Sequence, residues 1–267
     1  MQNRIDQLFA SKKKDILNIY CTAGYPEPDS TLTIMKALQD SGVDIIELGM
    51  PFSDPLADGP VIQDSSTRAL KNGMSLHKLF EQLDGFRKDI HVPVILMGYL
   101  NPVLQYGVEA FLKKCAETGI DGLILPDLPM AEYEQDYKHL FEQYNLDLIF
   151  LVTPETSDAR IRKIDTLSRG FIYAVSSSST TGKDKDMGNQ EAYFERLKSL
   201  QLSNPVLIGF GIKDKPTFDA AAAHANGAII GTAFIRALDN STDIVATVKN
   251  FVGNIRNGKA AEEPIIL

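Results

Sequence analysis

The sequence is poor in the residues that build disulfide frameworks and metal centres. It has no tryptophan, four scattered histidines and only two cysteines, Cys21 and Cys115, in 267 residues. Two cysteines so far apart, outside any metal-ligand spacing, indicate neither a disulfide framework nor a zinc site. We therefore expect no bound metal, and we expect both thiols to be buried as small apolar side chains.

Positive charge and long apolar runs are equally scarce. The chain carries 27 lysines and arginines against 35 aspartates and glutamates, a formal net charge of −8. Without a basic stripe, neither a nucleic acid nor an anionic membrane is an expected partner. The first ten residues are amphipathic rather than signal-like, and no run is long enough to span a bilayer. These absences favour a cytoplasmic protein, in which backbone amides would hold any phosphate ligand.

The sequence is rich in short, nearly continuous apolar runs. Eight of them lie at 16–21, 44–48, 94–97, 122–125, 148–152, 171–175, 206–209 and 228–230. Such runs are typical of strands covered on both faces, and most are separated by segments of helical spacing. This alternation predicts an α/β fold with a parallel sheet. Eight units without a linker predict a single (β/α)8 barrel domain over residues 1–267, with an extra N-terminal helix. A doubly wound open sheet is the alternative.

Helical spacing also predicts the connecting helices, and glycine predicts where some of them end. The predicted helices cover 30–40, 61–71, 75–88, 109–117, 130–144, 158–167, 190–200 and 233–238. The run Thr156-Ser157-Asp158 is a candidate cap for the start of the segment that begins at 158. Gly42, Gly119 and Gly227 each precede a predicted strand, so we expect them to end helices in the left-handed conformation.

The most informative stretch of the chain runs from Glu47 to Gln63. An apolar run ends on Glu47, and a loop rich in proline and glycine then presents Asp58. The loops that follow the strands of a parallel barrel lie at one end, so both carboxylates are expected at one small-molecule site. Taken alone, Glu47 would be an ordinary strand-end acid and Asp58 a turn residue. The apolar flanks of Glu47 favour catalysis, because desolvation raises the pKa of a buried carboxyl.

Three glycine clusters follow the last three predicted strands, at 176–182, 209–212 and 231–234. Glycine lets a ligand approach the backbone, and the last two loops of a barrel often form a phosphate site with a short helix. The clusters match neither a dinucleotide-binding loop nor a Walker motif. A solvated loop is the simplest interpretation of the polar segment at 181–188, but its position fits a mobile lid over the barrel mouth better.

These motifs resemble those of tryptophan synthase α subunits. The likeness extends from the amino-terminal helix to about Arg236. Beyond the stretch 47–63 it rests on Tyr99-Leu100-Asn101-Pro102, Leu125-Pro126-Asp127-Leu128-Pro129, Thr181-Gly182, Gly209-Phe210-Gly211-Ile212 and Gly231-Thr232-Ala233. The resemblance implies a barrel lyase of tryptophan biosynthesis that splits indole-3-glycerol phosphate into indole and glyceraldehyde 3-phosphate. One departure is Ser177, where several members of the family have arginine.

The resemblance also implies roles for particular residues. Glu47 is implied to protonate carbon 3 of the indole ring and to assist removal of the glycerol hydroxyl proton, while Asp58 binds the indole N–H. Phosphate binding is implied for Gly182, Gly211, Gly231 and Thr232, and Thr181 falls in the lid. The positions that match the indole pocket of the family are Tyr20, Ile62, Tyr99, Ile124, Leu151, Tyr173 and Phe210.

A partner protein is implied as well. In the family, indole passes to a β subunit of an α2β2 complex, and that subunit carries pyridoxal phosphate, so no cofactor is expected on this chain. We expect the β subunit to dock on the loop 51–60 and the turn beside it, at Pro51, Asp54, Pro55, Asn101 and Pro102.

Two other functions remain open from the sequence. The chain could be a different phosphate-binding barrel isomerase or epimerase, or a non-catalytic subunit that activates a partner. Intact Glu47 and Asp58 argue against the non-catalytic subunit. The lack of histidines at predicted strand ends argues against a metal-dependent epimerase.

Overall fold

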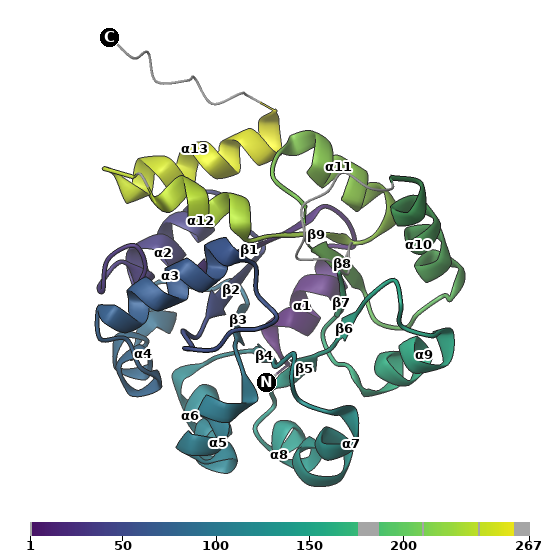
Figure 1. Cartoon of the computed structure of the whole chain (residues 1–267), viewed down its shortest axis with the longest axis horizontal. Helices are drawn as coiled ribbons and strands as arrows, with labels where there is room; N and C mark the ends of the chain where they lie inside the picture. Colours follow the sequence, from purple (N-terminus) through teal and green to yellow (C-terminus); the bar gives the residue numbers. More distant parts are fainter. Residues whose placement is uncertain (1, 176–186, 210, 240, 259–267) are drawn as a thin grey trace.

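Strands and helices alternate around a closed barrel (Figure 1). The computed structural model describes residues 2–175, 187–209, 211–239 and 241–258. Within these ranges every strand pair is parallel. The strands are β1 (Ile16–Thr22), β2 (Ile45–Gly49), β3 (Val94–Met97), β4 (Gly122–Ile124), β5 (Asp147–Ile149), β6 (Leu151–Val152), β7 (Ile172–Val175), β8 (Val206–Gly209) and β9 (Gly227–Ile230). The predicted (β/α)8 barrel is confirmed, and the strands of the described residues do not form the alternative open sheet.

The barrel closes through a strand that is interrupted at Phe150. β5 pairs with β4 on one side, and β6 pairs with β7 on the other. The carbonyl of Phe150 accepts a hydrogen bond of 3.0 Å from the backbone amide of Tyr173. The single strand predicted at 148–152 is therefore two short strands of one continuous segment. The other strands follow in the order β4-β3-β2-β1-β9-β8-β7, so the described residues fill eight barrel positions.

The helices surround this barrel, except for α1, which lies across its centre in Figure 1. They are α1 (Arg4–Ser11), α2 (Thr31–Asp40), α3 (Pro60–Lys71), α4 (Leu76–Gln82), α5 (Leu100–Tyr106), α6 (Val108–Thr118), α7 (Met130–Glu132), α8 (Lys138–Gln143), α9 (Asp158–Leu167), α10 (Met187–Ser199), α11 (Lys215–His224), α12 (Thr232–Asp239) and α13 (Ile244–Asn257), with a 3-10 turn η1 (Phe86–Lys88) and a π-helical turn η2 (Tyr133–Tyr137). None of these described helices is long and apolar enough to cross a membrane.

Most predicted helices are confirmed, and two of them are interrupted. The segment predicted at 75–88 is divided into α4 and η1, with Gly85 between them in the left-handed conformation at a φ of 68°. The segment predicted at 130–144 contains η2 between α7 and α8. The cap predicted within 156–158 is confirmed at Ser157, whose side chain accepts a hydrogen bond from the amide of Arg160. The predicted set does not include α5, α11 or α13.

Two of the three glycine predictions are confirmed. Gly42 and Gly119 follow α2 and α6 with φ values of 88° and 98°. The prediction for Gly227 is wrong, because this residue begins β9 and α11 ends before it at an extended Ala225. A Cβ on Gly227 would lie 2.0 Å from the carbonyl oxygen of Ile16. Glycine at 227 therefore lets β9 and β1 approach each other.

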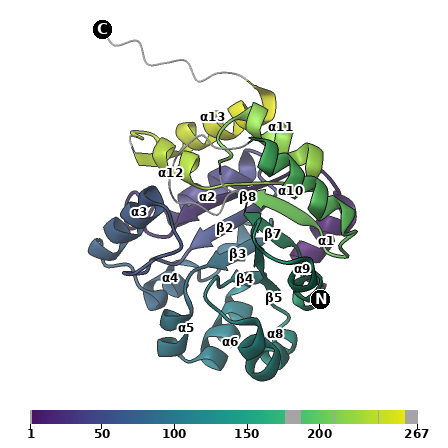
Figure 2. The same cartoon turned by 45° about the vertical axis from the view of Figure 1, so that its right-hand side comes forward.

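Helix α1 covers the amino-terminal end of the barrel. The Asn3 side chain accepts a hydrogen bond of 2.9 Å from the amide of Ile5 and donates one of 2.7 Å to the carbonyl of Asp121, just before β4. Ile5 and Phe9 join the apolar interior, where the rings of Phe9 and Phe171 lie 6.0 Å apart. Figure 2 shows α1 and α3 on opposite sides of the strands. The functional site is therefore expected at the carboxyl ends of the strands.

The extent of the domain is only partly described. Residues 259–267 lie outside the described part of the chain. The assignment of residues 1–267 to one domain therefore stays a prediction.

Candidate active site

Glu47 lies inside the barrel on β2. Alternation along the strand places it on the same face as Ile45, which belongs to the apolar interior. Its side chain is 1% exposed, and its register partner on β1 is Tyr20. Asn18, also on β1, donates a hydrogen bond of 2.9 Å from Nδ2 to Glu47 Oε2. The strand-end acid of the sequence is therefore a buried carboxyl with one neutral donor.

Burial makes Glu47 a weak acid. Desolvation raises its pKa from the ordinary 4.5 to about 8, the hydrogen bond from Asn18 lowers it, and the charge of Asp58 raises it again. A carboxyl with this pKa is mostly protonated at neutral pH, so it can give a proton to a substrate and take one back. The burial agrees with the expectation from the apolar neighbours of Glu47, and its catalytic role stays a prediction.

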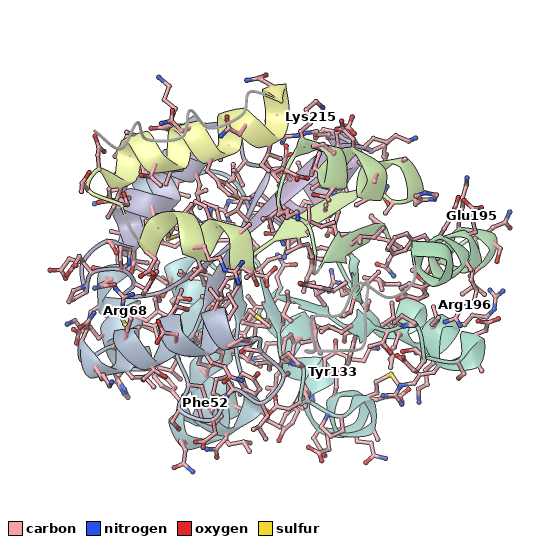
Figure 3. The ribbon with its side chains drawn as sticks, turned by 45° about the horizontal axis from the view of Figure 1, so that its top comes forward. Phe52, Arg68, Tyr133, Glu195, Arg196 and Lys215 are labelled. Carbon is pink, nitrogen blue, oxygen red and sulfur yellow. The ribbon has the colours of Figure 1, made fainter. Side chains whose placement is uncertain are left out.

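Asp58 lies on the loop between β2 and α3, where Tyr99 holds it. Tyr99 Oη donates a hydrogen bond of 3.0 Å to Asp58 Oδ2 and accepts one of 3.0 Å from the amide of Ala57. Phe52, labelled in Figure 3, stacks on the Tyr99 ring with centroids 5.2 Å apart. Burial raises the pKa of Asp58 to about 6, and the hydrogen bond from Tyr99 lowers it. Asp58 is therefore mostly ionised at neutral pH, while Glu47 is mostly neutral.

Helix α3 fixes the other end of this loop. Pro60 begins the helix, a position where its missing N–H is not needed. The Gln63 side chain donates a hydrogen bond of 2.8 Å to the carbonyl of Asp58. Further along α3, the Ser65 and Thr22 hydroxyls lie 2.7 Å apart and join the helix to the end of β1. The position of Asp58 thus depends on α3 as well as on Tyr99.

Two tyrosines lie beside these carboxyls. Tyr20 and Tyr173 are both buried, and the charges of Glu47 and Asp58 add to burial in raising the pKa of both phenols. Each ring needs a glycine on the neighbouring strand. A Cβ on Gly49 would lie 2.1 Å from Tyr20 Oη, and a Cβ on Gly209 would lie 2.4 Å from Tyr173 Oη. These two glycines make room for the aromatic rings.

The remaining predicted members of the indole pocket come from several elements. Ile124 on β4 and Leu151 on β6 pack with Tyr173 in the barrel interior. Ile62 is a buried residue of α3, and Tyr99 precedes α5. Their role in binding indole stays a prediction.

Gly211, Gly231 and Thr232 lie at the carboxyl ends of β8 and β9. Gly231 immediately precedes α12, whose first amides have no partner within the helix. Gly211 is exposed, with a left-handed φ of 76°. Among the described residues nothing lies within 4 Å of a Cβ placed on Gly211, and the nearest atom to one on Gly231 is 3.5 Å away. Packing does not require glycine at either position, so both leave space for a ligand.

Several predicted features lie outside the described residues. They are Thr181, Gly182 and Phe210, together with the part of the predicted lid that precedes α10. Their roles in phosphate binding, in the indole pocket and in closure stay predictions.

The residues predicted to meet a partner lie beside Asp58. Asp54 and Asn101 are exposed, Pro51 and Pro102 are half-buried, and Pro55 is buried. Leu56, on the same loop, is 88% exposed. Sequence reasoning missed it, although an apolar residue in a polar loop is a recognisable signal. Its exposed apolar side chain makes Leu56 a candidate member of the docking surface predicted on this loop.

Sequence reasoning also missed the two side chains that hold the carboxyls. Asn18 is not among the predicted site residues, and Tyr99 is predicted only as pocket lining. The signal for Asn18 is an amide two residues before Tyr20 in an otherwise apolar strand, on the same face of β1. Cys21 and Cys115 are buried as predicted. In the described part of the chain, no three potential ligating side chains come together as a metal site.

These features define a class of protein: a (β/α)8 barrel with two carboxyls of unlike pKa, Glu47 inside it and Asp58 on the loop after β2. The family model described as tryptophan synthase alpha chain matches residues 7–262. The tryptophan synthase alpha chain of Flavobacterium johnsoniae is 56% identical over 255 residues, covering 95% of this chain and 100% of the relative. That of Christiangramia forsetii is 57% identical over 256 residues, covering 95% and 98%.

Solved structures agree with these relatives. A tryptophan synthase subunit alpha from Legionella pneumophila has a TM-score of 0.86 and 35% identity, covering 96% of this chain and 98% of that chain. A tryptophan synthase from Mycobacterium tuberculosis has a TM-score of 0.86 and 31% identity, covering 97% and 98%. The chain belongs to the tryptophan synthase alpha chain family, which decides against a different barrel isomerase or epimerase.

The raised pKa of Glu47 predicts a pH-dependent stability. In the unfolded chain Glu47 ionises above its ordinary pKa of 4.5, whereas in the fold it does so near 8, so its contribution to stability is lost as the pH rises between these values. Glu47→Gln removes this loss. The free energy of unfolding of this variant, measured in urea, should exceed that of the wild type. The difference should grow as the pH rises from 4.5 to about 8, by at most about 1.4 kcal/mol per pH unit.

The exposed acid Glu81 on α4 provides the control for this prediction. Glu81→Gln removes the same charge far from the barrel interior and should give no comparable gain. A gain for Glu47→Gln that is equal at pH 5 and pH 8 would contradict the prediction.

Proposed function

We propose that Glu47 and Asp58 carry out the cleavage of indole-3-glycerol phosphate to indole and glyceraldehyde 3-phosphate. As a member of its family, the chain is the lyase subunit of a tryptophan synthase in tryptophan biosynthesis. The observation that supports these residue roles is the pair of unlike carboxyls, a buried Glu47 with a pKa of about 8 and Asp58 with a pKa of about 6. One can donate a proton while the other keeps a fixed negative charge.

The reaction uses the same carboxyl twice, first to donate a proton and then to accept a different one. Neutral Glu47 protonates carbon 3 of the indole ring, which breaks its aromaticity and leaves positive charge on the ring nitrogen. Asp58 accepts a hydrogen bond from the indole N–H and stabilises that charge. Ionised Glu47 then takes the proton of the adjacent glycerol hydroxyl. The carbon–carbon bond breaks, its electrons restore the aromatic ring, and Glu47 is again neutral.

The substrate lies between these carboxyls and the late loops in this proposal. Gly211, Gly231 and Thr232 bind the phosphate with backbone amides and a hydroxyl, together with Gly182. The indole ring lies among the aromatic and aliphatic side chains that include Tyr20 and Tyr173. Phosphate binding at one end of the pocket fixes the distance from the glycerol carbons to Glu47, and such positioning contributes to the rate.

A tryptophan synthase β subunit is the partner of the chain, in an α2β2 complex. We place its docking surface on the loop that carries Asp54 and Leu56 and on the neighbouring Asn101-Pro102 turn. We also propose that pyridoxal phosphate belongs to that partner, that this chain needs no cofactor, and that the complex is cytoplasmic.

Removing the transferable proton tests the role of Glu47. Glu47→Gln keeps the shape of the side chain, so substrate binding should persist while turnover falls by on the order of 10²–10⁴. Indole release from indole-3-glycerol phosphate measures turnover, and a shift of the urea midpoint monitors folding. Near-normal turnover in the folded variant would refute the assignment.

Adding a methyl group to the phosphate site tests the role of Gly231. Its φ is not left-handed and a Cβ at this position would meet only ordinary contacts, so Gly231→Ala should fold. The methyl group should keep the phosphate from the amides and raise KM by about tenfold. Gly253→Ala on α13, where nothing described lies within 4 Å of the Cβ, is the control and should leave KM unchanged. Equal KM values for the two variants would remove Gly231 from the site.

Removing the exposed apolar side chain of Leu56 tests the docking surface. Leu56→Ser should raise the concentration of β subunit needed for half-maximal activation by about tenfold, because a fully buried leucine contributes roughly 1.5–3 kcal/mol. The isolated chain should keep its basal rate. Val245→Ser, which removes an exposed apolar residue on α13, should change neither quantity. Identical activation of both variants would move the docking surface elsewhere.

A further inference from the structure

The side-chain amide of Asn18 is buried, and among the described residues only its nitrogen has a hydrogen-bond partner. Its Nδ2 donates to Glu47 Oε2 at 2.9 Å, while no described residue makes a hydrogen bond with its Oδ1. Both side chains are enclosed, Asn18 at 0% and Glu47 at 1% exposure. An unsatisfied buried acceptor destabilises a fold, and an apolar side chain of similar size would avoid that cost. The contact with Glu47 therefore explains Asn18 better than packing does.

The hydrogen bond also distinguishes the two oxygens of Glu47. A neutral carboxyl has one O–H oxygen and one carbonyl oxygen, and the carbonyl oxygen is the better acceptor for an N–H donor. Because Asn18 donates to Oε2, the carbonyl character lies on Oε2 and the proton lies on Oε1. An ionised Glu47 keeps the same donor, and the bond to a charged acceptor is stronger.

We propose that Asn18 is a positioning residue that donates to Glu47 Oε2 and so keeps the transferable proton on Glu47 Oε1. This inference rests on the proposed function. Oε1 gives its proton to carbon 3 of the indole ring, and Asn18 stabilises the negative charge that this transfer leaves on the carboxylate. Oε1 then takes the proton of the glycerol hydroxyl, which returns the carboxyl to its first state.

The other groups that act on Glu47 do not supply this stabilisation. Asp58 comes from the loop before α3, Tyr20 and Cys21 come from β1, and Tyr173 comes from β7. Each of these groups is negative or neutral, and no described cation contributes to the pKa of Glu47. Asn18 is therefore the donor on which the ionised carboxylate depends.

Asn18→Leu tests the proposal, because leucine has a similar size and no N–H. In the wild type, activity should fall as the pH rises past the pKa of Glu47, since the proton donor is lost. In Asn18→Leu this alkaline limb of the pH profile of kcat should shift to higher pH by about one pH unit or more. At pH 7, kcat should fall by about tenfold with little change in KM. The urea midpoint should not fall, because the orphaned oxygen is also removed.

Asn18→Asp keeps the shape of the side chain and replaces the amide donor with a carboxyl. Its negative charge beside Glu47 should also move the alkaline limb upwards. Ser168→Ala is the control: it removes a different buried oxygen without a described partner, the hydroxyl of a residue before β7 at the other end of the barrel. It should leave the limb and kcat at their wild-type values.

Three results would overturn the role of Asn18. The first is an alkaline limb of kcat that stays at its wild-type pH in Asn18→Leu, and the second is a parallel fall of kcat and of the urea midpoint without any shift of that limb. The third is failure of both Asn18 variants to fold, which would make Asn18 a folding residue. Failure of the proposed function is distinct, since the wild-type chain with its β subunit would then release no indole from indole-3-glycerol phosphate.

Discussion

The cost of burying a carboxyl in an apolar barrel is the constraint on which the rest of the site depends. Desolvation disfavours the charged form of Glu47, so the fold keeps it neutral at neutral pH. Asp58 lies on a loop with a hydroxyl donor and a lower pKa, so it keeps its charge. The same burial that weakens the fold above the ordinary pKa of glutamate keeps on Glu47 the proton that the proposed reaction needs. Stability and activity conflict at this residue.

The two ends of the barrel divide these tasks. At the amino-terminal end, Asp121 accepts hydrogen bonds from Arg4, Arg87 and the amide of Val94, and α1 covers the interior. At the carboxyl end, glycines make room for aromatic rings or leave space for a ligand. The carboxylate of Asp121 is satisfied by the protein at the first end, whereas the second end leaves space for a substrate. A chain arranged in this way can accept a reactive, partly unsatisfied site without losing its fold.

The sequence predicts the barrel because continuous apolar runs are specific to strands covered on both faces. It does not reveal the break at Phe150, since phenylalanine suits a strand and the interruption arises from pairing with different neighbours. The prediction that Gly227 ends a helix fails because glycine is also needed where two strands approach closely, and the sequence alone does not distinguish the two cases. The burial of Glu47 follows from its neighbours in sequence, whereas the bonds from Asn18 and Tyr99 join residues 29 and 41 positions apart and need the fold to bring them together.

The ionisation of Glu47 itself is the most direct test of this account. Difference infrared spectroscopy of the wild type against Glu47→Gln isolates the carbonyl stretch of the protonated Glu47 carboxyl across a pH titration. The account predicts that this band is present at pH 7 and disappears with a midpoint near pH 8. A band that is lost with a midpoint near the ordinary pKa of 4.5 would show that Glu47 is charged at neutral pH and would contradict its role as the proton donor.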